Sequence, residues 1–154
     1  MIKAIIFDLD NTLLDFVKMK QFAVKAAITA MNEAGLEANE DKAYDDIMDL
    51  YVTTGWENQQ VFDDYLHKTK GEVSNKILAA GVVAYRRARE ATLLVYPNVN
   101  KTLIELLKNQ IRLAVVSDAP SREAWMRLYY LNLHHVFDPV LTFDDTGARK
   151  PSPE

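Results

Sequence analysis

The chain lacks cysteine, long apolar runs and any block of basic residues. None of its 154 residues is cysteine, which excludes disulfides, thiolate nucleophiles and Cys-ligated metals. No apolar stretch approaches the roughly 20 residues that a membrane-spanning helix needs. The net charge is −4, from 18 basic and 22 acidic residues spread along the chain, so nothing predicts a nucleic-acid surface.

The N-terminus also lacks the features of a secretory signal, which combines a charged start, a longer apolar run and a small-residue cleavage site. With the absences above, this predicts a soluble cytoplasmic protein that binds neither membrane nor nucleic acid. The length predicts one domain, or one and a half, and 49% hydrophobic residues suffice for a core.

The first stretch of the chain carries the strongest functional pattern. Residues 2–7 are apolar apart from Lys3 and rich in β-branched and aromatic types, which predicts a short buried strand. The polar cluster Asp8–Thr12 comes directly after it, with Asp8 and Asp10 one residue apart. In α/β sheets, ligands bind just beyond the carboxyl ends of the strands.

Two neighbouring carboxylates repel each other unless a cation or a shared proton relieves them. The pair Asp8 and Asp10 therefore indicates a metal site, a proton-transfer role, or both. The alternative is an ordinary turn, because Asp and Asn are common turn residues.

Residues 16–92 are predicted to be helical throughout. Apolar side chains recur there at steps of three and four, which predicts helices over 16–34, 41–52, 58–68 and 74–91. Four successive helices cannot belong to an alternating βαβ sheet. They therefore form a separate helical unit, inserted after the first strand.

After Leu93 the pattern alternates. It predicts a helix over 99–108, strands over 111–116 and 140–142, and an intervening helix over 122–132. This order is typical of a parallel sheet with right-handed crossovers. The predicted fold is α/β, a Rossmann-like doubly wound parallel sheet that is incomplete in this chain. Residues 1–15 and 93–154 form this split domain, and residues 16–92 form the inserted helical unit.

The C-terminal residues Lys150–Glu154 resemble the start of a helix. Ser152 stands at an N-cap position, followed by a proline and an acidic residue. We expect from this that the sequence is a fragment of a longer protein. The alternative is a flexible tail.

Polar residues thus stand after each of the three predicted strands. They are the cluster Asp8–Thr12, then Ser117, then Lys150 with Pro151. In order and context they resemble the first three motifs of the haloacid dehalogenase superfamily. The helical insert matches the position of that family's cap domain.

The resemblance implies phosphoryl transfer to a carboxylate. Asp8 would be the nucleophile and form an aspartyl-phosphate, and Asp10 would be the general acid and base. It also implies a Mg²⁺ ion at the Asp8 carboxylate and the Asp10 backbone carbonyl, since this cation prefers oxygen ligands.

The same resemblance implies a set of groups that bind the phosphate. They are the Ser117 hydroxyl, the backbone N–H groups of Leu9 and Asp118, and the Lys150 ammonium. Thr12 would be a support residue whose hydroxyl orders the loop.

Asp10 also distinguishes branches of the superfamily. A departing halide needs no proton, whereas an alkoxide does, so Asp10 favours a phosphatase over a dehalogenase. Alternatives are a phosphomutase and a catalytically inert fragment or scaffold. Residues 80–87 and the short cap resemble a branch that includes glyceraldehyde 3-phosphate phosphatases, which implies a small phosphorylated metabolite as substrate.

One family motif has no counterpart in this sequence. The fourth motif, an acidic pair that completes the Mg²⁺ site, would come after Glu154. Asp144 and Asp145 precede Lys150 and are therefore interpreted as a solvated loop. We expect the fragment alone to bind metal poorly and to have slight activity.

Overall fold

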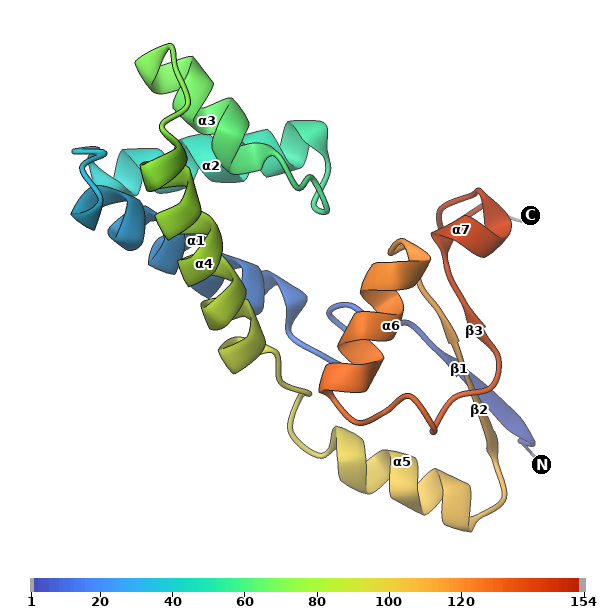
Figure 1. Ribbon diagram of the computed structural model, residues 1–154. Helices are drawn as coiled ribbons and strands as arrows, with labels where there is room; N and C mark the ends of the chain where they lie inside the picture. The colour runs from blue at the N-terminus through green and yellow to red at the C-terminus, as the bar shows by residue number, and fades with distance from the viewer. Residues whose placement is uncertain (1, 153–154) are drawn as a thin grey trace. The chain divides into compact units, whose positions relative to one another are not determined.

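The computed structural model describes residues 2–152 and has an α/β fold (Figure 1). Its elements in chain order are β1 (Ala4–Phe7), α1 (Phe16–Glu33), α2 (Glu40–Thr54), α3 (Val61–Lys70), α4 (Asn75–Thr92), α5 (Val99–Lys108), β2 (Arg112–Val116), α6 (Ser121–Tyr130), β3 (Val140–Leu141) and α7 (Phe143–Thr146). The predicted fold class is confirmed, and so is each predicted helix and strand, with ends shifted by a few residues.

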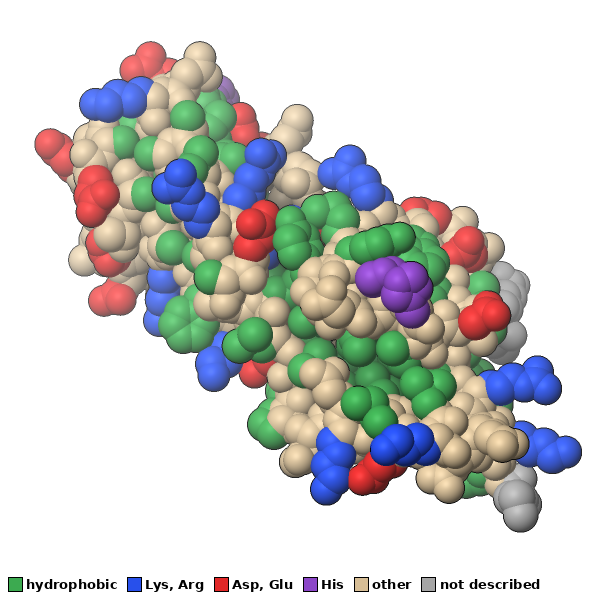
Figure 2. Space-filling view, turned by 60° about the horizontal axis from the view of Figure 1, so that its bottom comes forward, with side chains coloured by type: hydrophobic (Ala, Val, Ile, Leu, Met, Phe, Trp, Pro, Cys, Tyr) green, Lys and Arg blue, Asp and Glu red, His purple; other side chains and the backbone are tan. Residues whose placement is uncertain are grey.

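The chain divides into two compact units. The first comprises Met1–Val17 and Leu93–Glu154, and the second comprises Lys18–Thr92. These bounds lie within two residues of the predicted core and cap, whose roles as domains stay a prediction. In the view of Figure 2, acidic and basic side chains are interspersed, as expected for a chain without a basic block.

The first unit is built on a three-stranded parallel sheet in the order β1-β2-β3. In the ladder, Phe7 pairs with Val115 and Val116 pairs with Leu141. The three strands therefore end at the same edge of the sheet, and the residues after them emerge side by side. This register is what brings the polar loops of the sequence together.

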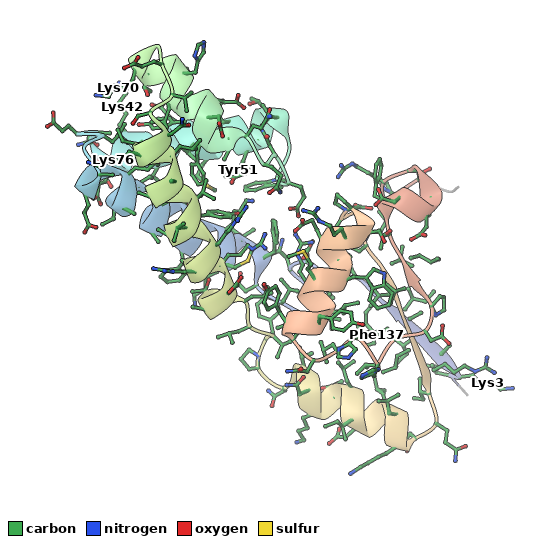
Figure 3. All side chains as sticks on the ribbon, viewed as in Figure 1. Lys3, Lys42, Tyr51, Lys70, Lys76 and Phe137 are labelled. Carbon is green, nitrogen blue, oxygen red and sulfur yellow. The ribbon has the colours of Figure 1, made fainter. Side chains whose placement is uncertain are left out.

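The two faces of the sheet differ in burial. Residues that pair directly point to the same face, so Ile5 and Phe7 share one face with Leu113 and Val115, which are 2% and 0% exposed. The ring of Phe137, labelled in Figure 3, packs edge-on against Phe7 at 6.1 Å.

Ile6 points to the opposite face and is 68% exposed. The prediction that the first strand is buried is therefore wrong for this face. Exposure alternates along β1, because within residues 2–152 only the face that carries Ile5 and Phe7 is partly covered.

The second unit consists of helices around their own apolar core. The Asn39 side chain accepts a hydrogen bond from the Lys42 N–H (2.9 Å) and caps α2, while α3 ends at Gly71 in the left-handed conformation. The core contains fully buried side chains from α1, α2, α3 and the connection between α1 and α2, among them Val24, Ile28, Met31, Leu36, Ile47, Tyr51, Val61 and Leu66. This unit therefore has the packing of an independent helical layer.

Within the described part of the chain, no helix is both long enough and apolar enough to cross a membrane. The predicted helix start at Ser152 involves Pro153 and Glu154, which lie outside the described residues.

Candidate active site

The loop after β1 is fixed by its own backbone. The Asn11 N–H donates to the Leu14 carbonyl (2.8 Å), and the Leu13 N–H donates to the Leu9 carbonyl (3.0 Å). Asn11 takes a positive φ of 59°, which asparagine tolerates in tight turns. Leu9 and Leu14 are fully buried and anchor the loop. Leu9, between the two acidic residues, points into the core, whereas the side chains of Asp8 and Asp10 stay partly exposed, at 40% and 24%.

Lys150 contacts Asp8 directly. Its ammonium nitrogen lies 2.5 Å from Asp8 Oδ1 and donates a second hydrogen bond to the Val116 carbonyl (2.8 Å). The Thr12 hydroxyl donates to the other Asp8 oxygen, Oδ2, at 3.1 Å. One carboxylate thus receives a cation and a hydroxyl from two separate segments. Asp8 and Lys150, which the family resemblance places at one phosphate site, are thus in direct contact, and the Thr12 hydroxyl, expected to order the loop, contacts the same carboxylate.

The loop after β2 is joined to the same site. Ser117 is 3% exposed, its backbone N–H donates to the Leu141 carbonyl (2.9 Å), and its Oγ accepts from the Ala119 N–H (3.2 Å). Asp118 Oδ1 accepts from the backbone N–H of Lys150 (2.9 Å). The Asp118 side chain therefore holds the segment that carries Lys150, a contact that sequence reasoning did not anticipate. No direct hydrogen bond joins Ser117 to Asp8 among the described residues.

Asp10 has a different partner from Asp8. Its Oδ2 accepts a hydrogen bond from the guanidinium of Arg127 on α6 at 2.9 Å, and the Arg127 side chain is only 7% exposed. The sequence contained a signal for this residue, because Arg127 lies on the apolar face of α6 with Ala124 and Leu128. A cation on a buried helix face requires an anion.

A short helix, α7, connects β3 to the segment that carries Lys150. Thr142 and Asp145 form a capping box, in which Asp145 accepts from the Thr142 N–H (2.8 Å) and hydroxyl (2.7 Å). These hydrogen bonds hold the pKa of the Asp145 carboxyl below its usual value. Asp144 accepts from the Ser121 N–H at 2.7 Å.

The interpretation of Asp144 and Asp145 as a solvated loop is therefore wrong in one respect. Both are exposed, as predicted, but they are helical and hydrogen-bonded. The reason is the spacing of Thr142 and Asp145, which satisfies the backbone N–H groups at the start of a helix. Within residues 2–152, no cluster of three or more His, Asp or Glu side chains could hold a metal ion.

The sequence matches the family described as haloacid dehalogenase-like hydrolase over residues 2–154. It is 34% identical over 152 residues to a glyceraldehyde 3-phosphate phosphatase from Methanothermobacter thermautotrophicus, covering 99% of this chain and 67% of the relative. It is 35% identical over 156 residues to a protein of the same name from Methanopyrus kandleri, covering 100% of this chain and 67% of that protein.

Solved structures have the same fold. A protein from Thermotoga maritima assigned as a β-phosphoglucomutase matches with a TM-score of 0.72 at 23% identity, covering 99% of this chain and 66% of that one. A hydrolase of the same family from Deinococcus radiodurans R1, with bound phosphate and sodium, matches with a TM-score of 0.59 at 16% identity, covering 96% and 61%. This chain thus spans about two thirds of the length of the relatives it matches. The extent of the family match and the identity to the relatives confirm the resemblance to this family: the chain belongs to the haloacid dehalogenase-like hydrolases.

Proposed function

We propose that the protein is a Mg²⁺-dependent phosphatase that hydrolyses a small phosphate monoester through an aspartyl-phosphate. The observation that carries this proposal is the contact between Lys150 Nζ and Asp8 Oδ1, at 2.5 Å, beside the loop of Ser117. A carboxylate next to a fixed cation and a buried hydroxyl can attack phosphorus while those groups bind the phosphoryl oxygens.

The proposed reaction has two steps. In the first, an Asp8 oxygen forms a bond to phosphorus, the ester P–O bond breaks, and protonated Asp10 gives its proton to the leaving alkoxide. In the second, a water oxygen attacks the aspartyl-phosphate and gives a proton to the Asp10 carboxylate. Phosphate leaves, and both carboxyl groups return to their initial state. The Ser117 hydroxyl, Lys150 and the N–H groups of Leu9 and Asp118 bind the phosphoryl oxygens in both steps.

The donor set near Asp8 fits Mg²⁺. This cation usually binds through one or two carboxylates and keeps several waters, and the Asp8 carboxylate with the Asp10 carbonyl supplies oxygen donors of that kind. A Mg²⁺ ion held there supplies positive charge that offsets the charge of the phosphoryl group. Lys150 contributes charge from the opposite segment, so the chain itself provides part of the neutralisation.

We propose a sugar phosphate or triose phosphate as the substrate. The supporting facts are the names of the relatives, which include glyceraldehyde 3-phosphate phosphatases at 34% and 35% identity and a phosphoglycolate phosphatase from Aquifex aeolicus at 31%. All these names denote small anionic metabolites. We propose that residues 16–92 act as the cap domain and contact the part of the substrate beyond the phosphate.

The test is an assay of the protein with Mg²⁺ against a panel of small phosphate esters. We expect release of inorganic phosphate, and we expect Asp8→Asn to abolish it without loss of the folded state. Isomerised sugar phosphate in place of free phosphate would indicate the phosphomutase. Neither product, with the wild type folded and loaded with Mg²⁺, would leave the inert scaffold as the explanation.

A further inference from the structure

Arg127 is one of the few buried charged side chains of the described chain. The residue is 6% exposed, and its guanidinium donates to Asp10 Oδ2 at 2.9 Å. The pair joins α6 to the loop after β1 across 117 positions of sequence. Burying a guanidinium costs free energy unless its partner is well placed, so the burial of this pair calls for a structural or functional explanation.

The position of the guanidinium is fixed from more than one side. Its carbon lies 4.7 Å from the centre of the Phe16 ring, and Phe16 is itself 6% exposed. On α6, Ala124 and Leu128 flank Arg127 and are fully buried. A planar guanidinium packed on an aromatic ring and carried by a buried helix face has little freedom to move.

We propose that Arg127 is the positioning residue for Asp10 in the reaction described above, so this inference depends on the proposed function. Arg127 holds one carboxyl oxygen of Asp10 and thereby sets the direction of the whole carboxyl group. A general acid and base works only when its oxygen is within hydrogen-bond reach of the atom that exchanges the proton. Asp10 lies in a loop and its side chain is 24% exposed, so a buried guanidinium at one of its oxygens limits the rotamers that it can adopt.

The role predicts a dependence on the leaving group. An alkoxide needs a proton from Asp10 when it departs, whereas p-nitrophenolate departs without one. In Arg127→Met, kcat/KM for an alkyl phosphate should therefore fall by about tenfold or more, with the 10²- to 10⁴-fold contribution of a general acid as the upper limit. For p-nitrophenyl phosphate kcat/KM should change by less than about threefold, because its first step does not need the acid.

Hydrolysis of the aspartyl-phosphate, the second step of the proposed reaction, gives an independent kinetic prediction. Water attack needs Asp10 as a base whichever ester was cleaved, so kcat for p-nitrophenyl phosphate should fall in Arg127→Met. A burst of p-nitrophenolate matching the number of active sites should then precede the slower steady rate. If Arg127 had only a structural role, Arg127→Met would lower kcat/KM for both substrates by the same factor and would produce no burst.

Two matched variants complete the kinetic test. Arg122→Met removes another arginine of α6, whose side chain is 81% exposed. This variant should leave kcat/KM unchanged for both substrates. Arg127→Lys keeps the charge without the planar fork and should restore part of the alkyl phosphate activity. Equal losses for both esters, or no loss in Arg127→Met, would overturn the inference while leaving the phosphatase proposal intact.

A stability measurement, which does not depend on activity, tests whether Arg127 and Asp10 contact each other in solution. Urea midpoints of Arg127→Met, Asp10→Asn and the double variant should be non-additive, since the two side chains contact each other. Additive shifts would mean that the pair does not form in solution and would overturn the inference whatever the activity. A wild type that releases no phosphate from either ester would reject the proposed function, and the positioning role with it.

Discussion

Lys150 Nζ and Asp8 Oδ1 lie 2.5 Å apart although 142 positions of sequence separate them. The contact depends on the parallel register, which brings the ends of β1 and β2 to one edge of the sheet. It also depends on Asp118, whose side chain accepts from the Lys150 N–H (2.9 Å) and holds the segment after α7 against the loop after β2. The carboxylate that we propose as nucleophile is therefore neutralised by a residue from the far end of the chain.

Replacing Lys150 by methionine should damage catalysis far more than folding. Loss of one donor to a phosphoryl oxygen costs about 10²- to 10³-fold in kcat by analogy with oxyanion sites. The ion pair is about 40% exposed on both sides, so its effect on the free energy of unfolding should be below about 1 kcal/mol. Phosphate release and urea denaturation measure the two effects.

Arg149→Met is the matched control for Lys150→Met. Arg149 is the adjacent cation, and its guanidinium carbon lies 4.8 Å from the centre of the Phe143 ring. Its described contact is therefore with Phe143 and not with Asp8. We expect near-normal phosphate release from this variant. An equal loss in both variants would contradict a specific role for Lys150.

The capping box of α7 predicts an acid-sensitive contribution to stability. The hydrogen bonds from Thr142 lower the pKa of Asp145 from 3.8, so they stabilise the folded state above that pH. This contribution is lost as the pH falls through the lowered pKa, because the folded and unfolded states then both carry a protonated carboxyl. Asp145→Asn should be less stable than wild type at pH 7 and should approach it in strong acid.

Urea midpoints as a function of pH measure this difference. Asp49→Asn is the control, because Asp49 is an exposed carboxylate of α2 whose side chain makes no hydrogen bond within the described residues. A constant difference between Asp145→Asn and wild type at every pH would rule out the proposed link to the Asp145 carboxyl.

Tyr51 predicts a loss of stability in alkaline solution. Burial raises the pKa of Tyr51 above 10.0, and the neighbouring Tyr85 adds to the shift; burial also raises the pKa of Tyr44 and Tyr65. The unfolded chain releases the Tyr51 proton near pH 10 while the folded chain keeps it. The free energy of unfolding should therefore fall above that pH, and Tyr51 alone contributes a slope of about 1.4 kcal/mol per pH unit.

Tyr51→Phe should reduce the steepness of this alkaline loss. The variant lacks one of the hydroxyls that the folded state keeps protonated, so one proton fewer is linked to unfolding. Tyr129→Phe serves as control, since Tyr129 is 61% exposed. Urea denaturation between pH 8 and about pH 11 gives both slopes; identical slopes in wild type and Tyr51→Phe would contradict the prediction.

A methyl group at Gly81 in α4 should destabilise the folded state. A Cβ atom at this position would lie 2.7 Å from Met31 Cγ and 2.9 Å from Met31 Sδ, and Met31 is fully buried. Overpacking costs about 1–3 kcal/mol, whereas alanine in a helix gains about 1 kcal/mol over glycine. We expect Gly81→Ala to lower the free energy of unfolding by about 1 kcal/mol. In a Met31→Ala background the same change should be neutral or stabilising, and additive effects would argue against the clash.

The sequence predicted the fold well because its signals are local. Apolar positions at helical spacing mark the four helices of the second unit, and two short apolar runs mark β1 and β2. Asp8 and Ser117 could be found because each comes directly after a strand, and Lys150 because its motif with Pro151 resembles that of a known family. Their direct contacts depend on strand register and loop closure, which no single segment encodes.

Two features escaped prediction for identifiable reasons. Arg127 is distant in sequence from Asp10, and only its place on an apolar helix face signals a buried partner. The helix α7 was missed because its capping box, Thr142 with Asp145, uses aspartate where glutamate or glutamine is more usual.

The edge position of β1 determines how the candidate nucleophile is held. Successive backbone amides of a strand point alternately to its two sides, so β2 protects only about half of those in β1 from hydrogen exchange. The remaining amides face outward from the ladder within residues 2–152. The rigidity of Asp8 therefore comes less from its strand than from the loop on its C-terminal side, where Leu9 is fully buried and the turn is closed between Asn11 and Leu14.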